Sequence, residues 1–350
     1  MAAVLAMQGR HDEALDCYDT LIGHHPTLAQ AHVNKAYLLL NLGRYPEGWR
    51  EYEYRWQCSE APALPDFSRP LWLGEQSLSG KAILLVGEQG FGDMIHFMRY
   101  ACLVADSGAR VYLQVPAALK SLAASCPGVV AVFTPQEALP PFDYFCPLMS
   151  LPLACGTTLS TIPNSIPYLT AAGDRVALWR DRIGATAPST RLRVGLAWAG
   201  DARLSQPMAA MMDQQRSMHF GRLLPLLDVP GIEFFSLQVG EAARAQLEGN
   251  ARVRDLASHL RDFEDTAALI ENLDLVISVD TSIVHLSGAI GKRVWMLDRL
   301  GHCYRWLPGR DDSPWYPSLK IFRQTVSGDW DGVIERAKQA LVRLLEGASD

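Results

Sequence analysis

The chain has 350 residues, 49% of them hydrophobic and 20% charged, which is enough to bury more than one core and favours two or three domains. Its net charge of −6 argues against nucleic acid as a partner, because nucleic-acid-binding proteins carry a basic surface. No apolar run approaches the roughly 20 residues that span a bilayer, so we expect no transmembrane segment. The opening stretch MAAVLAMQGRHDEAL lacks the basic leader of a signal peptide.

The cysteines give information about the compartment. They are scattered, odd in number, and no two have the close spacing of a zinc site. This usage is typical of a reducing compartment, so we expect a cytoplasmic protein with no metal and no other cofactor. The seven are Cys17, Cys58, Cys102, Cys126, Cys146, Cys155 and Cys303.

An internal repeat opens the chain. Four residues recur at one offset of 34 residues, Gly9-Arg10 as Gly43-Arg44, Glu13 as Glu47 and Tyr18 as Tyr52, and a small residue recurs as Ala14 and Gly48. This offset is the period of the tetratricopeptide repeat (TPR), a pair of helices. We therefore expect a short all-α TPR segment over residues 1–58, with an ordinary helical hairpin as the alternative. Two units are fewer than the roughly three that a free-standing array needs, so the segment should pack on the next domain.

A change of composition follows the repeat. Residues 59–80 are rich in Pro, Ser and Gly and are interpreted as a linker. From residue 81 to 116 the chain runs through an apolar stretch, a glycine-rich turn, a helical pattern and a second apolar stretch. This order predicts a β-α-β unit with buried parallel strands. With two further strand-like runs at 129–133 and 143–146, it forms a first domain that we assign to residues 81–185.

A second series of the same kind occupies residues 190–325. Apolar, strand-like runs occur at VGLAWAG, IEFFSLQ, DLVISVD and RVWML, with helical patterns between them. Two alternating series predict two doubly wound α/β domains. The remaining stretch, 326–350, has apolar residues at helical spacing and is expected to be an amphipathic C-terminal helix.

The strongest local motif is Gly87-Glu88-Gln89-Gly90-Phe91-Gly92-Asp93, between a strand and a helix. Its glycines allow close approach of a ligand, and the helix N-terminus offers N–H groups to an anion or a sugar oxygen. The spacing is neither GxGxxG nor a P-loop. Asp93 falls in the first helical turn, where a simple capping role is the alternative to a catalytic one.

A second motif, Asp280-Thr281-Ser282 with His285 one turn later, joins a buried strand to a helix. The carboxyl ends of strands are where open α/β sheets bind ligands, although these residues could also serve only as helix caps and a core histidine. The residue types are those of a hydrolase triad, but no GxSxG surrounds the serine, so we reject a hydrolase.

Polar residues follow two other strands of the second domain. Trp198 and Gly200 end one strand, Arg216-Ser217 follow after a polar loop, and Gln238 ends the next strand. An arginine here can neutralise a diphosphate leaving group, and Gln238 can read a base or a ribose. A surface arginine and a polar cluster at the sheet edge are the alternatives.

Together these pieces resemble the TPR-linked relatives of the heptosyltransferase family, glycosyltransferase family 9. The resemblance covers nearly the whole chain, and the ordered set is more specific than any single motif. It implies a GT-B fold, in which two Rossmann-like domains face each other across a nucleotide-sugar cleft. The matching stretches are GRYPEGWREYEYRW, GEQGFGDMIHFMRYA, VGLAWAG, QRS, FFSLQ, DFEDTAALIENLDLVISVDTSIVHLSGAIGKRVWML and DSPWYPS.

The resemblance also implies an inverting, metal-independent transfer from a nucleoside-diphosphate sugar to a protein or glycan acceptor. Asp93 matches the acidic position proposed as general base, within an acceptor loop formed by Gly90, Phe91 and Gly92. The donor site implied by the match comprises Trp198, Gly200, Arg216, Ser217, Gln238, Asp280, Thr281, Ser282 and His285. With no metal, cationic side chains and helix N-termini must stabilise the departing diphosphate.

Some features depart from the family or leave alternatives open. The loop from Asp201 to Gln215 lacks the lysine that many heptosyltransferases carry, so the donor sugar need not be a heptose. A sugar-nucleotide epimerase would need further carboxylates that we cannot point to. A non-catalytic scaffold, in which the repeats bind a partner, is opposed by Asp93 and Arg216. We expect the repeats to recruit a macromolecular acceptor, while simple packing of Trp49, Tyr52 and Trp56 on the first domain is the alternative.

Overall fold

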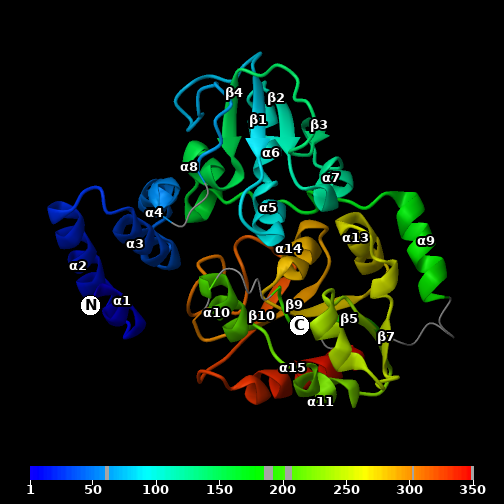
Figure 1. Ribbon diagram of the computed structural model, residues 1–350. Helices are drawn as coiled ribbons and strands as arrows, with labels where there is room; N and C mark the ends of the chain where they lie inside the picture. Colours follow the sequence, from blue (N-terminus) through cyan, green and yellow to red (C-terminus); the bar gives the residue numbers. More distant parts are fainter. Residues whose placement is uncertain (60–62, 185–191, 202–206, 302, 348–350) are drawn as a thin grey trace.

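A computed structural model describes residues 1–59, 63–184, 192–201, 207–301 and 303–347. Figure 1 shows three parts: a helical segment at the N-terminus, an α/β domain above, and a larger α/β domain below. Within the described ranges, no helix is long and apolar enough to cross a membrane.

The N-terminal segment consists of two helix pairs and a short 3-10 helix. The elements are α1 (Ala2–Met7), α2 (His11–His24), α3 (Ala29–Asn41), α4 (Tyr45–Tyr52) and the 3-10 helix Glu53–Gln57. The predicted 34-residue repeat is visible in their geometry. The turn glycines of the two pairs, Gly9 and Gly43, both have a φ of 77°. The second helix of each pair begins with the same kind of ion pair, Arg10–Glu13 in the first and Arg44–Glu47 in the second.

The first α/β domain has a four-stranded parallel sheet in the order β3-β2-β1-β4. Every residue of β1 is buried, as expected for a central parallel strand covered on both faces. Its elements are β1 (Ala82–Val86), α5 (Phe91–Phe97), α6 (Tyr100–Asp106), β2 (Arg110–Gln114), α7 (Ala117–Ala123), β3 (Val129–Phe133), β4 (Tyr144–Pro147) and α8 (Leu151–Ala154), with 3-10 helices at Leu148–Ser150 and Leu159–Thr161.

The stretch interpreted as a linker is partly built into this sheet. Leu71 forms a parallel bridge with Phe145 of β4, and the Trp72 N–H donates to the Phe145 carbonyl at 2.9 Å. Trp72 is buried, and its indole N–H donates to the Gln76 carbonyl at 3.0 Å. The second half of the stretch therefore protects the edge of β4 from solvent.

The second α/β domain has a six-stranded parallel sheet in the order β10-β9-β8-β5-β6-β7. The order reverses between β5 and β8, which is the switch point where such sheets bind ligands. Its elements are β5 (Leu192–Ala197), α10 (Pro207–Arg216), α11 (Leu224–Leu227), β6 (Ile232–Ser236), α12 (Glu241–Arg244), β7 (Val253–Asp255), α13 (Phe263–Glu271), β8 (Leu275–Val279), α14 (Ser282–Ala289), β9 (Val294–Asp298), β10 (Leu319–Arg323) and α15 (Trp330–Leu345), with 3-10 helices at Phe220–Leu223, Ala245–Leu247 and Ala257–His259.

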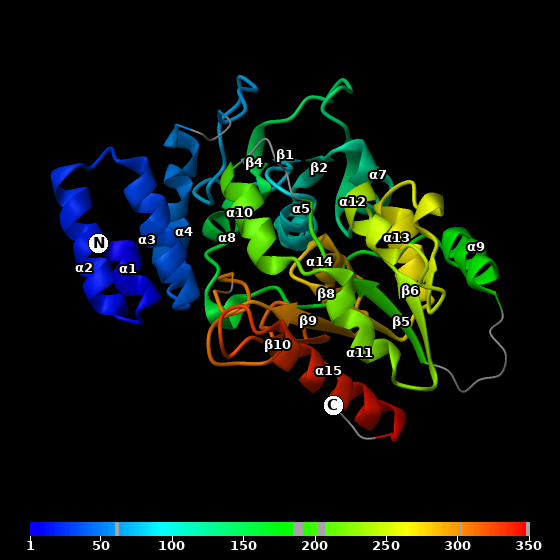
Figure 2. The same ribbon diagram turned by 60° about the horizontal axis from the view of Figure 1, so that its bottom comes forward.

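The predicted C-terminal helix corresponds to α15, which belongs to the second domain. Its apolar face, including Trp330, Val333 and Leu341, is buried with side chains of β5, β8 and β9. Figure 2 shows α15 along the side of this sheet that faces away from the first domain.

The boundary between the α/β domains lies earlier than the expected position near residue 185, because helix α9 (Gly173–Ile183) belongs to the second domain. This helix packs on α13 of the second domain, where the Trp179 indole N–H donates to Asp265 at 3.2 Å and Arg175 to the same carboxylate at 2.5 Å. The chain therefore crosses between the domains before α9. Figure 1 shows α9 at the right of the molecule, beside α13.

The helical segment is anchored on both α/β domains through α4. The Trp49 ring contacts Phe97 of the first domain and Tyr304 of the second, with ring centres 5.9 and 5.4 Å apart. Tyr45 stacks on Trp315 of the second domain at 5.9 Å. Trp49 is buried in the main core. The helical segment therefore does pack on the α/β domains, which was the alternative to recruitment of an acceptor.

Candidate active site

Two helix N-termini meet between the sheets. Helix α5 of the first domain lies against α14 of the second, as Figure 1 shows in the middle of the molecule. The approach is closest at Gly92, where a Cβ atom would lie 2.8 Å from Cδ2 of His285 and 3.4 Å from Cα of Ser282. Only a residue without a side chain fits this contact. The first N–H groups of a helix have no partner within the helix, so a helix N-terminus favours an anion.

Asp93 has two roles at the start of α5. One carboxylate oxygen accepts from the Gly90 N–H at 3.1 Å and so caps the helix, as the simpler sequence interpretation holds. The other forms an ion pair with Arg305 of the second domain. The Asp93 side chain is 23% exposed, so solvent or a ligand still reaches it.

Arg305 is a site residue that the sequence did not indicate. It lies between β9 and β10 with only 8% of its side chain exposed. One terminal nitrogen donates to the Cys303 sulfur at 3.1 Å, and the guanidinium lies 4.6 Å from the centre of the Tyr304 ring. Its Nε is buried and finds no hydrogen-bond partner among the described residues. Arg305 thus brings a buried positive charge to the Asp93 carboxylate.

The Asp280-Thr281-Ser282 turn ends β8 at the switch point. Thr281 is the N-cap of α14, and its hydroxyl accepts from the Ile283 N–H at 3.3 Å. Asp280 and Ser282 are half-buried beside it. Burial, together with the neighbouring charge of Asp280, raises the pKa of Asp298 at the end of β9 to about 7, although Arg323 opposes this. Two carboxyl groups therefore lie close together at the carboxyl edge of the sheet.

His285 belongs to a buried network that joins the domains. Its Nδ1 lies 3.0 Å from the Tyr316 hydroxyl, and Nδ1 of His96 lies 2.9 Å from the same oxygen. Burial and nearby arginine charges lower the pKa of both histidines well below the usual value, so both rings are neutral near pH 7. His285 is thus a buried core histidine, which was the alternative interpretation from the sequence, and His96 of the first domain belongs to the same network.

Arg216 and Ser217 are held beside the end of β5. Nε of Arg216 donates to Asp213 at 3.0 Å, and the Ser217 hydroxyl bridges the other oxygen of Asp213 and the Gly200 N–H. A Cβ at Gly200 would lie 2.1 Å from the Asp213 carboxylate and 2.6 Å from a terminal nitrogen of Arg216. Gly200 therefore leaves room for the guanidinium, and Asp213, which the sequence did not indicate, orients it.

No family model matches the chain. A curated relative, Protein FlbA of Caulobacter vibrioides, is 26% identical over 346 residues, which cover 90% of this chain and 55% of that protein. The chain thus spans about half the length of the curated relative that it matches.

Solved structures match the architecture. The crystal structure of the glycosyl transferase family 9 from Veillonella parvula superposes with a TM-score of 0.57, at 10% identity, over 78% of this chain and 99% of that chain. The E. coli ADP-heptose lipopolysaccharide heptosyltransferase II gives 0.50, at 15% identity, over 76% and 100%. The chain has the fold of a family 9 glycosyltransferase. The α/β class with parallel sheets predicted from the sequence is thereby confirmed.

Two residues that were predicted to bind the donor, Trp198 and Gln238, are buried in the structure and contact only protein groups there. Trp198 is fully buried and packs on Phe220 with ring centres 5.0 Å apart. The Gln238 amide oxygen accepts from the Trp198 and Ala199 N–H groups at 3.0 Å, and its nitrogen donates to the Ala199 and Val239 carbonyls. Gln238 therefore shapes the backbone that leads to Gly200, and its amide is occupied by protein groups.

The other acceptor-loop residues lie at the domain interface. Phe91 is 40% exposed and contacts Phe263 of the second domain, with ring centres 4.9 Å apart. Gly90 precedes α5 in an extended conformation and gives its N–H to Asp93. The stretch in which a lysine is missing was predicted to be a polar loop, but from Pro207 onward it belongs to helix α10, and residues 202–206 lie outside the described residues. The described residues contain no group of three or more His, Cys, Asp or Glu side chains that could hold a metal ion.

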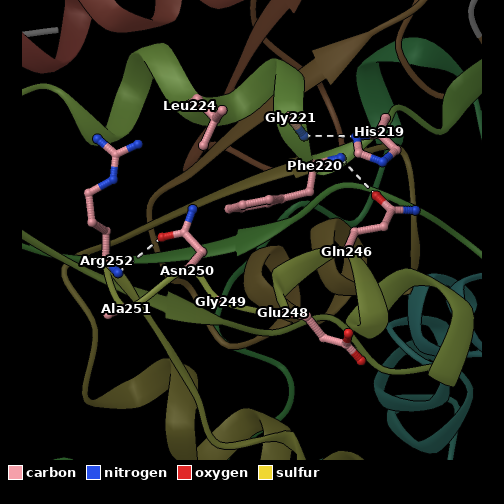
Figure 3. A pocket seen from close by; sticks show the side chains of 10 residues that line it. All are labelled: His219, Phe220, Gly221, Leu224, Gln246, Glu248, Gly249, Asn250, Ala251 and Arg252. Carbon is pink, nitrogen blue, oxygen red and sulfur yellow. Dashed lines mark hydrogen bonds between the residues drawn. The ribbon is translucent and has the colours of Figure 1, made fainter.

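An open hollow of about 510 Å³ lies elsewhere on the second domain (Figure 3). Two of its polar side chains are engaged in local contacts: Gln246 accepts from the Phe220 N–H at 2.8 Å and His219 from the Gly221 N–H at 3.1 Å. None of the predicted site residues lines it. The hollow is lined by His219, Phe220, Gly221, Leu224, Gln246, Glu248, Gly249, Asn250, Ala251 and Arg252.

Proposed function

We propose that this protein is an inverting, metal-independent glycosyltransferase that moves a sugar from a nucleoside-diphosphate sugar to a protein or glycan acceptor. The observation that carries the proposal is the meeting of α5 and α14, which brings Asp93 of one domain beside the Asp280–Ser282 turn of the other. The family 9 fold is a second support, because it supplies two facing domains for two substrates.

The donor diphosphate is assigned to the carboxyl edge of the second sheet. Arg216 supplies a cation there, and its bond to Asp213 fixes the planar guanidinium before the donor arrives. The N-terminus of α14, with Thr281 as its cap, supplies backbone N–H groups for phosphate oxygens. These groups stabilise the negative charge that grows as the bond between the sugar and the diphosphate breaks.

Asp93 is assigned as the general base. Each of its oxygens has one protein partner, and a carboxylate oxygen can accept two hydrogen bonds, so capacity remains for an acceptor hydroxyl. In the proposed step the acceptor proton passes to Asp93 while the acceptor oxygen attacks the anomeric carbon. The carbon–oxygen bond to the diphosphate breaks, and its electron pair leaves with the diphosphate. Attack from the face opposite the leaving group inverts the anomeric centre.

The helical segment is assigned as a pair of TPR units that presents a macromolecular acceptor. Tyr37 of α3 supports this, because its ring is 42% exposed although it contacts the buried Tyr52. Tyr52 in turn accepts from Gln89 at 2.8 Å, in the loop that leads to Asp93, so Tyr37 lies near the proposed base. A cytoplasmic location agrees with the seven cysteines, all of which are free thiols.

Donor binding gives the first test. The full chain is mixed with UDP-, GDP-, ADP- and CMP-linked sugars, and its melting temperature is measured for each. A ligand that binds only the folded state raises the melting temperature, by an amount that grows with ligand concentration. The proposal expects one nucleotide class to do so, and to lose the effect in Arg216→Ala. Stabilisation by none of the four would overturn it.

Stereochemistry gives the second test. Proton NMR of the first product formed from the binding donor should show an anomeric configuration opposite to that of the donor. Retention would refute the single-displacement mechanism. Transfer in the presence of excess EDTA should proceed at the untreated rate.

A further inference from the structure

The end of the helical segment contacts the loop that carries Asp93. Arg55, in the 3-10 helix after α4, forms a two-pronged ion pair with Glu88, with nitrogen–oxygen distances of 3.0 and 2.9 Å. The two side chains are only 7% and 9% exposed. Arg55 also donates to the Ser150 hydroxyl at 2.8 Å, and Glu88 accepts from the Met149 N–H at 3.0 Å. Arg55 also pairs with Glu53 at 2.7 Å, so these groups hold one another rigidly, and loss of Arg55 would leave the buried Glu88 carboxylate without its cation.

A second contact follows one residue later. Gln89 has a φ of 60°, a left-handed conformation that few residues other than glycine adopt without support. Its side-chain amide donates to the Tyr52 hydroxyl at 2.8 Å. Tyr52 is fixed in turn, because its ring is 1% exposed and packs edge-on against Trp49. The helical segment therefore holds Gln89 in its strained conformation.

These contacts reach Asp93 through a short stretch of backbone. Gln89 is bonded to Gly90, whose N–H donates to the Asp93 carboxylate at 3.1 Å. A change in the backbone at Gln89 would rotate the Gly90 N–H and alter the orientation of Asp93 before α5 begins.

We propose that the helical segment positions the catalytic loop, with Tyr52 and Arg55 as positioning residues for Asp93. The segment is thus a structural part of the active site as well as an assigned docking element. Asp93 is called catalytic on the strength of the proposed function, but the positioning of its loop can be measured whether or not that function holds.

The test compares two tyrosines of the same helix. Tyr52→Phe removes only the hydroxyl that accepts from Gln89. Tyr45→Phe makes the same change at a buried residue whose hydroxyl accepts from the Trp315 indole at 3.2 Å, away from the loop. Amide hydrogen exchange of the full chain is followed by mass spectrometry, in the peptide that contains Gly90. The Gly90 amide is informative because it is protected by its bond to Asp93.

We expect Tyr52→Phe to raise exchange at Gly90 about fivefold, the factor by which loss of a typical buried hydrogen bond shifts an equilibrium. Tyr45→Phe should leave this peptide unchanged. The Tyr52 hydroxyl also lies 3.9 Å from the Met149 sulfur, so in a Gln89→Ala background Tyr52→Phe should raise exchange at Gly90 much less than it does alone. Equal exchange in wild type and Tyr52→Phe would overturn the proposal, as would an equal rise in every peptide of the chain.

Kinetics add a second readout with the donor identified above. Tyr52→Phe should lower kcat severalfold with the KM for the donor unchanged, since the donor site is on the other domain. Tyr45→Phe should keep the wild-type kcat. A rise in donor KM without loss of kcat would contradict a positioning role for Tyr52. If neither variant nor wild type turns over while loop exchange responds as expected, the proposed function fails and loop positioning stands.

Discussion

The Asp93 carboxylate and the Arg305 guanidinium form an ion pair that joins the two α/β domains, although the residues are 212 positions apart in the chain. The pair is partly enclosed, with 23% of the Asp93 side chain and 8% of the Arg305 side chain exposed. Arg305 of the second domain thus holds one oxygen of Asp93, while the Gly90 N–H, just before α5, holds the other. A carboxylate held at both oxygens is pre-oriented for an incoming hydroxyl.

Asp93→Asn should abolish transfer and leave donor binding intact. Asparagine retains an oxygen that can cap α5 but cannot accept a proton, and loss of general-base catalysis costs about 10²–10⁴-fold in rate. Asp262→Asn is the matched control, because Asp262 caps α13 through the Asp265 N–H at 2.8 Å. Turnover is measured beside calorimetric donor binding. Wild-type turnover in Asp93→Asn would reduce Asp93 to a helix cap.

Arg216→Ala should weaken donor binding about 10–100-fold, since a hydrogen bond to a charged group contributes about 1.5–3 kcal/mol. Arg216→Lys should rescue only partly, because lysine lacks the planar fork that Asp213 holds. Arg222→Ala is the control, since that arginine pairs on the surface with Asp331. Calorimetry with the donor measures all three. Unchanged donor affinity in Arg216→Ala would remove the assigned role.

Gly92→Ala should disturb the contact between α5 and α14. The new methyl group would lie 2.8 Å from the His285 ring, so the helices must separate, at a cost of about 1–3 kcal/mol. Gly23→Ala is the control, because this exposed helical position has open space around it and alanine should stabilise it by up to about 1 kcal/mol. Urea unfolding and turnover are compared. If Gly92→Ala matches wild type in both, the close approach has no functional weight.

Asp265 should stabilise the protein in a pH-dependent way. Burial alone would raise its pKa, but hydrogen bonds from Arg261, Trp179 and Arg175 lower the pKa from 3.8 to about 2. A lowered carboxyl pKa gives stability that is present above about pH 4 and is lost as the pH falls through about 2. Asp265→Asn should therefore cost about 2 kcal/mol at pH 7 in urea unfolding, with the difference shrinking below pH 4. A pH-independent difference would contradict this assignment.

Truncation separates acceptor recruitment from packing. Deletion of residues 1–56 removes Trp49, Tyr52 and Arg55 from the core and should destabilise the whole chain. Deletion of residues 1–28 removes only α1 and α2, whose contacts form a separate cluster around Tyr18. The shorter deletion should stay folded and bind donor, yet lose transfer to a macromolecular acceptor. Full transfer by the folded 29–350 chain would refute recruitment through the first helix pair.

The sequence indicated the fold well where the pattern was local. The β-α-β unit around Gly87 was predicted because apolar runs and a glycine-rich turn alternate within about 30 residues. The course of α9 could not be predicted in the same way. The position of α9 on the second domain depends on the contact between Arg175 and Asp265, which are 90 positions apart. A contact over that separation leaves no periodic pattern in the sequence. Likewise, composition alone did not show that Leu71 and Trp72 join the edge of β4.

The candidate site was predicted in part, for a similar reason. Asp93 and the turn at Asp280 adjoin a glycine turn and a strand end, which sequence patterns reveal, whereas Arg216 ends α10 and was indicated only by the ordered set of motifs. Arg305 lies in an irregular segment between β9 and β10, where no motif distinguishes it from other arginines. Trp198 was expected to bind the donor. Instead its side chain, which directly follows the buried strand β5, is buried in the core. The chemical roles assigned to Asp93, Arg216 and the turn at Asp280 stay predictions.

The Tyr316 hydroxyl lies between two neutral imidazoles but has a single hydrogen to give, so His96 and His285 cannot both receive it. The tautomers of the two rings are therefore coupled across the domain boundary. Because Nε2 of His96 is buried and has no partner among the described residues, the favoured arrangement leaves that nitrogen without hydrogen, since a buried unpaired N–H is the rarer case. His96 then donates to Tyr316, whose own hydrogen can go to Nδ1 of His285 or to the Tyr168 hydroxyl at 3.3 Å; in the first case the hydrogen of His285 sits on Nε2.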